Sequence, residues 1–384
     1  MTHLGSFIST SRISVLKSRA VMIGLACSAL VLTGCATHSL SVLVPIQEAP
    51  KNGSEVNLLA ITTRAPSRLP GQIYSGERGE GLSSHIINVS VPPNHQTGRM
   101  EWPSSGTPDP ENEFAVLDLK SAAPQEAWAW FDQQETEGRL LIFVHGFNVQ
   151  FADAVFRLAQ ITEDLSIRAA PVLFSWPSGG ELLGYYYDRE SANFSRDAFE
   201  SVITQAAESE NVTQIAILAH SMGSWLTMET LRQMSIRNGE LPDKITDVVL
   251  AAPDLDIDVF EQQFQTLGDR RPHFTFLVSS DDRALNLSRS LGRGVERLGA
   301  IDPSEEPYKS RIEATPGVTV VDLSALEAND RLGHTKFAQS GEMVGLARQT
   351  LADDEGLTEE RTSIGEQAGA VIITLGQSVA GLSE

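Results

Sequence analysis

From residue 124 onward, short and uniformly apolar segments alternate with longer stretches that have the periodicity of helices. Strands without a polar side are buried on both faces, which is typical of a parallel sheet between layers of helices. The sequence therefore predicts an α/β fold with a mostly parallel sheet and helices on both faces. The predicted strands are 140–144, 172–174, 215–218, 248–251, 274–278 and 318–321. The predicted helices cover approximately 152–167, 194–209, 223–236, 256–267, 282–291 and 335–352.

A β-rich extension is predicted before this alternating region. Residues 56–63, 85–91 and 114–120 have the composition and alternation of strands, and the segments 64–84 and 92–113 between them are predicted loops rich in Gly, Pro and Ser. The sequence thus predicts one domain over 56–352, with its N-terminal β extension at 56–123. Residues 353–384 are a predicted C-terminal tail, whose apolar stretch at 364–382 suits a helix or a strand.

The first 34 residues have the features of a secretory signal. Arg12, Lys17 and Arg19 precede an apolar run at 20–32, which is shorter than the roughly 20 residues that a membrane-spanning helix needs. Leu-Thr-Gly-Cys at 32–35 resembles a bacterial lipobox, in which Cys35 is lipidated. We therefore expect a signal peptide at 1–34, a tether at 35–55 and anchoring in the outer membrane facing the periplasm. A plain secretory signal and an uncleaved anchor are the alternatives.

Composition excludes several function classes. The formal net charge is −21 and no Lys/Arg cluster stands out, which argues against nucleic-acid binding. Two cysteines cannot form a disulfide framework or a Cys-rich zinc site. The chain has no dinucleotide-binding glycine motif after a strand, no P-loop and no H-E-x-x-H motif. No cofactor and no metal are therefore predicted.

The predicted strand 215–218 leads into a short motif that carries a candidate nucleophile. Residues 219–223 read Ala-His-Ser-Met-Gly and a predicted helix follows, so the motif is the nucleophile elbow G-x-S-x-G with Ala in its first position. The turn would raise the hydroxyl of Ser221 above the sheet edge, and small residues such as Gly223 let strand and helix approach closely. A serine that merely caps the helix is the alternative interpretation.

The predicted strand 140–144 is followed by a loop that suits an oxyanion hole. It begins His145-Gly146-Phe147, and Gly146 permits an unusual backbone path. We expect the backbone N–H groups of Phe147 and Met222 to bind the oxyanion. His145 is interpreted as a residue that fixes this loop by hydrogen bonding. His220 is likewise expected to pack beside the site and not to act as the base.

Chain order indicates the remaining members of a catalytic triad. In this fold the order is Ser, then Asp or Glu, then His, and His334 is the histidine that follows the last strand. The acid should follow the strand 274–278, where Asp282 is the first choice and Asp281 an alternative. Asp254, one strand earlier, is a second alternative. The acidic run around Asp254 also has a simpler explanation as the first turn of a helix.

The segment 175–195 carries bulky side chains beside the expected site. Trp176, Tyr185 and Tyr186 are candidates for lining an acyl pocket, and ordinary loop packing is the alternative. Asp188 and Arg189 are interpreted as a solvated pair. A series of arginines that ends at Arg297 is interpreted as a solvated helix face.

Several segments together resemble a family. FVHGFNVQFADAVFRLAQ, LFSWPSGG, LAHSMGSWL, LAAPDLDIDVF, SSDDRALNLSRSLGRGVERLG and GHTKF are similar to uncharacterised bacterial α/β-hydrolases of the esterase/lipase superfamily, and so are AITTRAP and SVPPNHQTGRMEWP upstream. The resemblance covers roughly 56–350 and, with the lipobox, indicates a lipoprotein member. It implies the α/β-hydrolase fold and a triad of Ser221, Asp282 and His334. It implies little about the substrate.

The function expected from these features is that of a serine hydrolase. A carboxylesterase or lipase would cleave a small-molecule or lipid acyl ester through an acyl-enzyme on Ser221. Thioesters and amides are also compatible, because a fold does not determine a substrate. The alternative from another class is a lipid-anchored envelope scaffold or binding protein that has the hydrolase fold without turnover.

Overall fold

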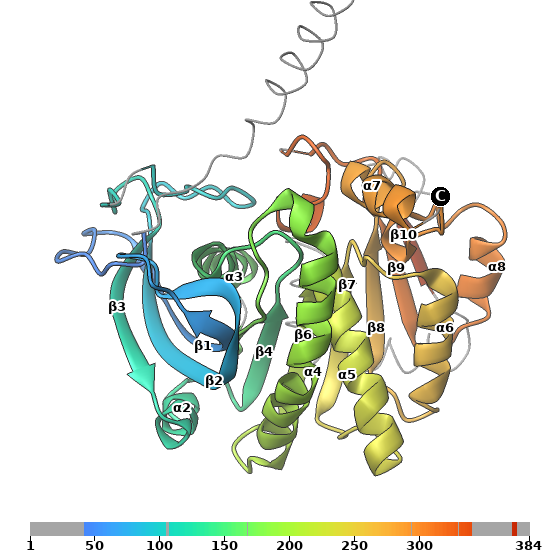
Figure 1. Cartoon of the computed structure of the whole chain (residues 1–384), viewed down its shortest axis with the longest axis horizontal. Helices are drawn as coiled ribbons and strands as arrows, with labels where there is room; N and C mark the ends of the chain where they lie inside the picture. The colour runs from blue at the N-terminus through green and yellow to red at the C-terminus, as the bar shows by residue number, and fades with distance from the viewer. Residues whose placement is uncertain are drawn as a thin grey trace, which may run out of the picture. The chain divides into compact units, whose positions relative to one another are not determined.

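The chain forms one large mixed sheet that carries helices on both faces (Figure 1). The computed structural model describes residues 42–104, 107–166, 168–292, 294–328, 330–339 and 371–374. Its ten strands lie in the order β10-β9-β8-β7-β6-β4-β5-β1-β2-β3. The strands are β1 (Ser54–Pro66), β2 (Tyr74–Val91), β3 (Ala115–Ala122), β4 (Arg139–Val144), β5 (Ala170–Ser175), β6 (Gln214–His220), β7 (Ile245–Ala251), β8 (His273–Val278), β9 (Val318–Asp322) and β10 (Val371–Thr374).

The sheet is parallel from β10 to β1 and antiparallel from β1 to β3. Strand β1 pairs parallel with β5 on one side and antiparallel with β2 on the other. Every predicted strand is present, and those of the parallel part are almost entirely buried. The predicted α/β fold with a mostly parallel sheet and an N-terminal β extension is thus confirmed.

The helices divide between the two faces of the sheet. Successive strand residues alternate in direction, so Leu140 and Ile142 belong to one hydrophobic core while Leu141 and Phe143 belong to the other. Helices α2, α4, α5, α6 and α8 pack on the first face and α3 on the second. The helices are α2 (Pro124–Phe131), α3 (Phe151–Leu165), α4 (Tyr185–Glu208), α5 (Met222–Asn238), α6 (Ile257–Thr266), α7 (Arg283–Leu291) and α8 (Tyr308–Glu313), with 3-10 turns η1 (Leu182–Gly184), η2 (Leu298–Ala300) and η3 (Lys336–Ala338).

Two elements differ from the sequence-based expectation. The predicted loop 64–84 is wrong, because β1 and β2 continue as a long hairpin in which Arg64 pairs with Arg78 and Pro66 with Tyr74. Antiparallel pairing satisfies the backbone of this Gly- and Ser-rich segment without an apolar pattern. Helix α4 begins at Tyr185 and not near residue 194. Its first turns bury polar residues such as Asp188, so the apolar period that marks a helix is missing there.

The ends of the predicted domain also contribute to the fold. Val42 and Leu43, in the predicted tether, are buried in the second core. Strand β10, in the predicted tail, pairs parallel with β9. Residues 1–41, which include the predicted signal and Cys35, and most of the predicted helix 335–352 lie outside the described residues. The domain limits therefore stay a prediction. Within the described ranges, no helix has the length and apolar character to cross a bilayer.

The stacking of α4 on the sheet gives a stability prediction. Phe199 is fully buried and its ring lies 4.5 Å from that of Phe174 in β5, whereas Phe194 on the same helix is 47% exposed. We expect Phe199→Ala to lower the free energy of unfolding by about 3–5 kcal/mol. The matched change Phe194→Ala should lower the free energy of unfolding by less than about 1.5 kcal/mol, because the side chain that it removes is about half exposed to solvent. Urea unfolding of both variants measures this, and equal losses would contradict the packing described.

Candidate active site

Ser221 occupies a strained turn between β6 and α5. Its φ of 52° and ψ of −119° lie outside the regions that residues with a side chain normally adopt. The turn is held by its own backbone, because Ser221 N donates to Ala251 O at 2.9 Å and Ser221 O accepts from Ser224 N at 3.0 Å. Asp254 N donates to the same oxygen at 3.2 Å. This is the geometry of the predicted nucleophile elbow, and it places Ser221, which is 4% exposed, at the carboxyl edge of the sheet.

Two glycines allow the elbow and the neighbouring loop to meet. A Cβ on Gly223 would lie 2.5 Å from His145 O, so only glycine lets α5 approach the end of β4. A Cβ on Gly146 would lie 3.0 Å from Ser221 Cβ and 2.9 Å from His220 Nδ1. The loop that follows β4 is therefore packed directly against the serine.

Asp282 and His334 form a buried hydrogen-bonded pair. His334 Nδ1 lies 2.7 Å from Asp282 Oδ2, and the carboxylate is fully buried. The other carboxylate oxygen accepts from Leu285 N at 3.0 Å, because Asp282 is the N-cap of α7. A carboxylate can only accept, so Nδ1 of His334 carries the proton and Nε2 presents its lone pair.

The two alternative acids are engaged elsewhere. Asp281 pairs with Lys336, whose Nζ lies 2.7 Å from Oδ1. Asp254 accepts from Ser288 Oγ at 2.6 Å and Tyr185 Oη at 2.8 Å. Its third partner is the buried Arg297, whose Nε lies 3.3 Å from Oδ1. Of the three candidates, Asp282 is thus the one that the structure joins to His334.

His220 lies between Ser221, which follows it in the chain, and His334, whose ring it contacts. The His220 ring lies 4.7 Å from the His334 ring, and His220 Nε2 is 3.2 Å from His334 O. Because Nε2 faces a carbonyl oxygen, it must donate, and His220 therefore fixes the backbone of His334. In the part of the chain that the structure describes, no hydrogen bond joins Ser221 Oγ to the His334 ring. Such bonds are often long without substrate and tighten when it binds.

The surroundings of His334 adjust its protonation. Burial alone would lower its pKa, but the hydrogen bond and charge of Asp282, with the charges of Asp254 and Asp330, outweigh burial and raise it above 6.5. The imidazolium is therefore stabilised relative to an isolated histidine. An arrangement of this kind suits a group that accepts a proton during a reaction.

Two backbone N–H groups beside the serine are available for an anion. Among the described residues, neither Phe147 N nor Met222 N donates to a protein acceptor. Met222 is the first residue of α5, where helix N–H groups have no intrahelical partner. These are the two donors that the sequence analysis assigned to an oxyanion hole.

His145 has the loop-fixing contacts expected of it. It is buried, its Nδ1 lies 2.9 Å from Gly146 O, and its Nε2 lies 3.1 Å from Ser175 Oγ. Burial and the nearby charge of Arg64 lower the pKa of His145 to about 3, so its ring is neutral at physiological pH. Trp176 stacks on it at 5.0 Å and donates its indole N–H to His145 O.

The predicted pocket residues separate in the structure. Trp176 is fully buried under His145, so its prediction as a pocket residue is wrong. Tyr186 is 77% exposed and points away from the core. Tyr185 is the member that lies near the site, with its ring 5.5 Å from that of Phe147. Burial raises the pKa of Tyr185, and so does the adjacent Asp254.

Three charged residues are buried in the structure. Two of them were expected to face solvent, and the third had no predicted role. Asp188 is fully buried and accepts from Gly179 N at 2.8 Å, so the expected solvated pair with Arg189 is wrong. Arg297 is 6% exposed and pairs with Asp254, which likewise overturns a solvated helix face at that position. Arg64 is 2% exposed. The sequence does carry one signal for Arg64, because it is a charged residue that directly follows an apolar strand segment. A charged residue that is buried in such a place normally has partners.

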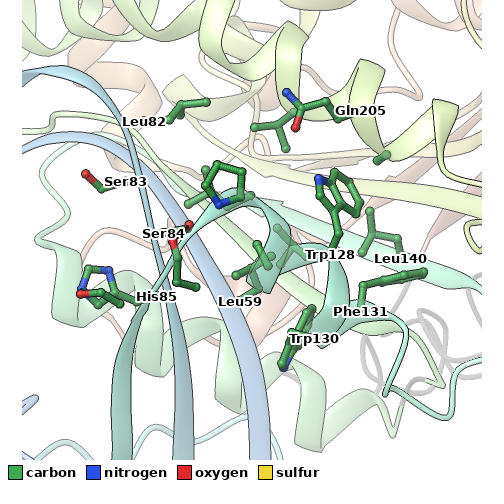
Figure 2. A pocket seen from close by; sticks show the side chains of 18 of the residues that line it. Leu59, Leu82, Ser83, Ser84, His85, Trp128, Trp130, Phe131, Leu140 and Gln205 are labelled. Atoms are coloured by element: carbon green, nitrogen blue, oxygen red, sulfur yellow. Dashed lines mark hydrogen bonds between the residues drawn. The ribbon is translucent and has the colours of Figure 1, made fainter.

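An apolar cavity of about 400 Å³ lies apart from these residues. Figure 2 shows its labelled lining, with Trp128 and Phe131 from α2, Leu59 and Leu140 from the sheet and Gln205 from α4. Leu140 is the second residue of β4, whereas the loop that carries Phe147 follows the last one. The cavity therefore lies toward the opposite end of the strands. Over the ranges that the structure describes, no cluster of three His, Cys, Asp or Glu side chains is placed to hold a metal.

Comparison with known proteins gives one family match. A family described as "Alpha/beta hydrolase of unknown function (DUF900)" matches residues 122–353. An uncharacterized protein of Nostoc sp. is 28% identical over 129 residues, which cover 27% of this chain and 34% of the relative. The chain thus spans about a third of the length of the curated relative that it matches.

The chain also matches solved structures at low sequence identity, among them the following two. A predicted CIB-like hydrolase from Thermoplasma acidophilum is 12% identical, with a TM-score of 0.36 and coverage of 78% of this chain and 98% of that chain. Est1E from Butyrivibrio proteoclasticus is 10% identical, with a TM-score of 0.34 and coverage of 73% and 96%. The fold is assigned from the strand order, the elbow and the family match, and not from these two structures.

The Asp282–His334 pair predicts a specific titration. We expect the pKa of the His334 imidazole to lie above the ordinary value of 6.5. NMR of its ring nuclei as a function of pH measures this. Asp282→Asn removes the charge and leaves the burial, so the pKa of His334 should fall below that of the wild type. Asp281→Asn is the control, because Asp281 pairs with Lys336 and should leave the titration nearly unchanged. An unaltered midpoint in Asp282→Asn would contradict the pair.

Proposed function

Since the chain belongs to the DUF900 family of alpha/beta hydrolases, we propose that it is a serine hydrolase that cleaves acyl esters through an acyl-enzyme on Ser221. Two observations carry this proposal. Ser221 lies on a strained elbow with a φ of 52°, and the ring of its neighbour His220 lies 4.7 Å from that of His334, whose Nδ1 is held by a buried carboxylate at 2.7 Å. Ser, His and Asp in this arrangement are a nucleophile, a base and the group that orients the base.

The proposed reaction follows from the protonation of the three groups. Nε2 of His334 takes the proton of Ser221 while Oγ attacks the carbonyl carbon of the ester. The imidazolium then gives that proton to the leaving alcohol as the carbon–oxygen bond breaks and the acyl-enzyme forms. Water, deprotonated by the same nitrogen, releases the acid and restores the serine. Asp282 stays ionised, keeps the proton on Nδ1 and stabilises the imidazolium.

The proposed oxyanion hole is formed by Phe147 N and Met222 N. As Oγ attacks, negative charge develops on the carbonyl oxygen, and both N–H groups are without another acceptor among the described residues. The N-terminus of α5 adds the favourable end of the helix dipole. Such donors stabilise the transition state more than the ground state, which is what accelerates the reaction.

An ester is the proposed substrate class, and the acyl group is proposed to lie near Tyr185. Its ring flanks Phe147, and its hydroxyl is held by Asp254 at 2.8 Å and lies 3.1 Å from Ser288 Oγ. Both partners reduce its freedom, so Tyr185 offers a rigid surface beside the proposed oxyanion hole. A small-molecule or lipid ester is compatible with this surface.

We also propose that the protein is lipidated at Cys35 and anchored in the outer membrane facing the periplasm. The proposal is supported by the basic N-terminal segment, the apolar run at 20–32 and the sequence Leu-Thr-Gly-Cys at 32–35. Anchoring would depend on acyl chains, because a chain with a net charge of −21 is repelled by anionic lipid.

Labelling with a fluorophosphonate tests the hydrolase proposal. The wild type should react at Ser221, because the reagent requires an activated serine. Ser221→Ala should abolish labelling, and Ser221→Ala and His334→Ala should each lower kcat for an acyl ester by a factor on the order of 10⁶. The matched control is Ser224→Ala, one turn of α5 away, where the hydroxyl bonds to Ala219 O at 3.2 Å and labelling should persist.

A folded wild type that neither labels nor turns over a series of acyl esters of different chain lengths would overturn the proposal. A non-catalytic scaffold or binding protein would then be the better description. Labelling that persists in Ser221→Ala would assign the nucleophile to another residue.

Metabolic labelling with a fatty acid tests the anchor. In a bacterial host, the wild type should incorporate the label and fractionate with outer membranes, whereas Cys35→Ser should lose both properties. Cys27→Ser is the matched control, because Cys27 lies within the apolar run and precedes the predicted cleavage site. Equal incorporation in Cys35→Ser and the wild type would contradict lipidation at Cys35.

A further inference from the structure

Arg64 is a buried cation that uses every donor it has. It lies in β1, and a guanidinium has five N–H groups. Nε donates to a side-chain oxygen, Nη1 to two backbone oxygens, and Nη2 to one backbone oxygen and one imidazole nitrogen. The acceptors are Ser175 Oγ at 2.9 Å, Ser75 O at 3.2 Å, Ser178 O at 2.8 Å, Val149 O at 2.7 Å and His145 Nε2 at 3.3 Å.

All five acceptors are neutral, which makes this an unusual environment for a charge. Burial lowers the pKa of Arg64 to about 10, opposed mainly by the charge of Asp188, so the side chain stays protonated at neutral pH. Within the described ranges, Arg64 forms no ion pair. A buried charge without a directly bonded counter-ion is costly, and the surrounding loops must be held in place to solvate it.

Arg64 and Gly146 O together indicate which nitrogen of His145 carries the proton. The neutral ring has one N–H. Nε2 lies 3.3 Å from Arg64 Nη2, which can only donate, and 3.1 Å from Ser175 Oγ, which can donate or accept. Nε2 must therefore accept, and the proton lies on Nδ1. Nδ1 in turn faces Gly146 O at 2.9 Å, so it donates to that oxygen.

The hydrogen bond to Gly146 O sets the direction of the Phe147 N–H. The two groups belong to the same peptide, which is planar and trans, so they point in opposite directions. Holding the oxygen on the His145 side turns the N–H to the other side. The same loop passes Ser221, since a Cβ on Gly146 would lie 3.0 Å from Ser221 Cβ.

The following residues of the loop are held from the Asp188 side. Asn148 N donates to Asp188 Oδ2 at 3.3 Å, and Val149 N donates to Ser178 Oγ at 3.1 Å. Ser178 Oγ itself donates to Asp188. The loop after Phe147 is thus held through its N–H groups by Asp188 and Ser178, and through Val149 O by Arg64.

We propose that Arg64, acting through His145, is a positioning residue that orients the Phe147 N–H toward the oxyanion of the reaction. The inference rests on the proposed function and extends it to β1, which lies outside the matched segment 122–353. The N-terminal β extension thereby becomes part of the catalytic architecture.

Substitution of Arg64 tests this role. Arg64→Met keeps the length of the side chain and removes all donors, so kcat per active site should fall by about 10²–10³, as for loss of one oxyanion donor. KM should change by less than about threefold, because ground-state binding does not use the oxyanion hole. Arg64→Lys retains a donor for His145 and should recover at least part of kcat. Fluorophosphonate titration counts the active sites in each sample.

The control separates positioning from stability. Arg78→Met removes the cation that pairs opposite Arg64 in the hairpin, whose Nε donates to Ser191 Oγ at 3.1 Å. It should lower the thermal midpoint and leave kcat per titrated site unchanged. If Arg64→Met behaves in the same way, Arg64 is a structural residue and the inference is overturned.

A readout without turnover tests the first step on the wild type itself. Nitrogen NMR should find the ring of His145 neutral with its proton on Nδ1, and this tautomer should be lost or mixed in Arg64→Met. A proton on Nε2 in the wild type overturns the inference even if the protein is an active hydrolase. If His145 has the expected tautomer but the wild type neither labels nor hydrolyses esters, the proposed function fails and the positioning role falls with it.

Discussion

Parallel pairing of the central strands is the constraint on which the whole site depends. Val144 of β4 pairs with Ala219 of β6, Ala219 with Leu250 of β7, and Leu250 with Phe276 of β8. These strands consequently end at nearly the same level, and the loops that follow them meet at one edge of the sheet. Phe147, Ser221 and Asp282 lie in such loops, and His334 lies in the loop after β9, whose Val320 pairs with Phe276. Residues that are far apart in sequence thus converge without any element having to cross the core.

Buried polar contacts then hold these loops at their correct distances. Lys336 is 2% exposed and donates to Asp281, to Leu323 O at 3.2 Å and to Ser324 O at 3.3 Å. One ammonium group therefore joins the loop after β8, the loop after β9 and the segment that carries the histidine. Because the neighbours of Asp282 and His334 share this cation, the distance between Asp282 and His334 is set by the surrounding loops as well as by the pair itself.

The sequence was most informative where local pattern and chain order coincide. Apolar runs located the strands, the elbow motif located Ser221, and the order of the triad selected His334 and put Asp282 first. It was least informative where long-range contacts decide the environment. The sequence left Asp281 and Asp254 open as partners of His334. In the structure Asp281 pairs with Lys336 and Asp254 with Arg297. The buried state of Arg64 was not predictable, because its acceptors come from loops that only the folded sheet brings together.

The position of β1 between β2 and β5 links the order of folding to the assembly of the site. Thr62 in β1 donates to Ser175 O in the adjacent strand β5. The two residues are 113 positions apart in the sequence, so this contact is non-local. Closing so long a loop is entropically unfavourable until many contacts form together. The hairpin is synthesised before β5 and has to await it. A chain whose central sheet has formed but whose hairpin has not docked would possess Ser221, Asp282 and His334 and lack the guanidinium of Arg64, so the loop after β4 would lack the contacts that Arg64 makes with His145 and Val149.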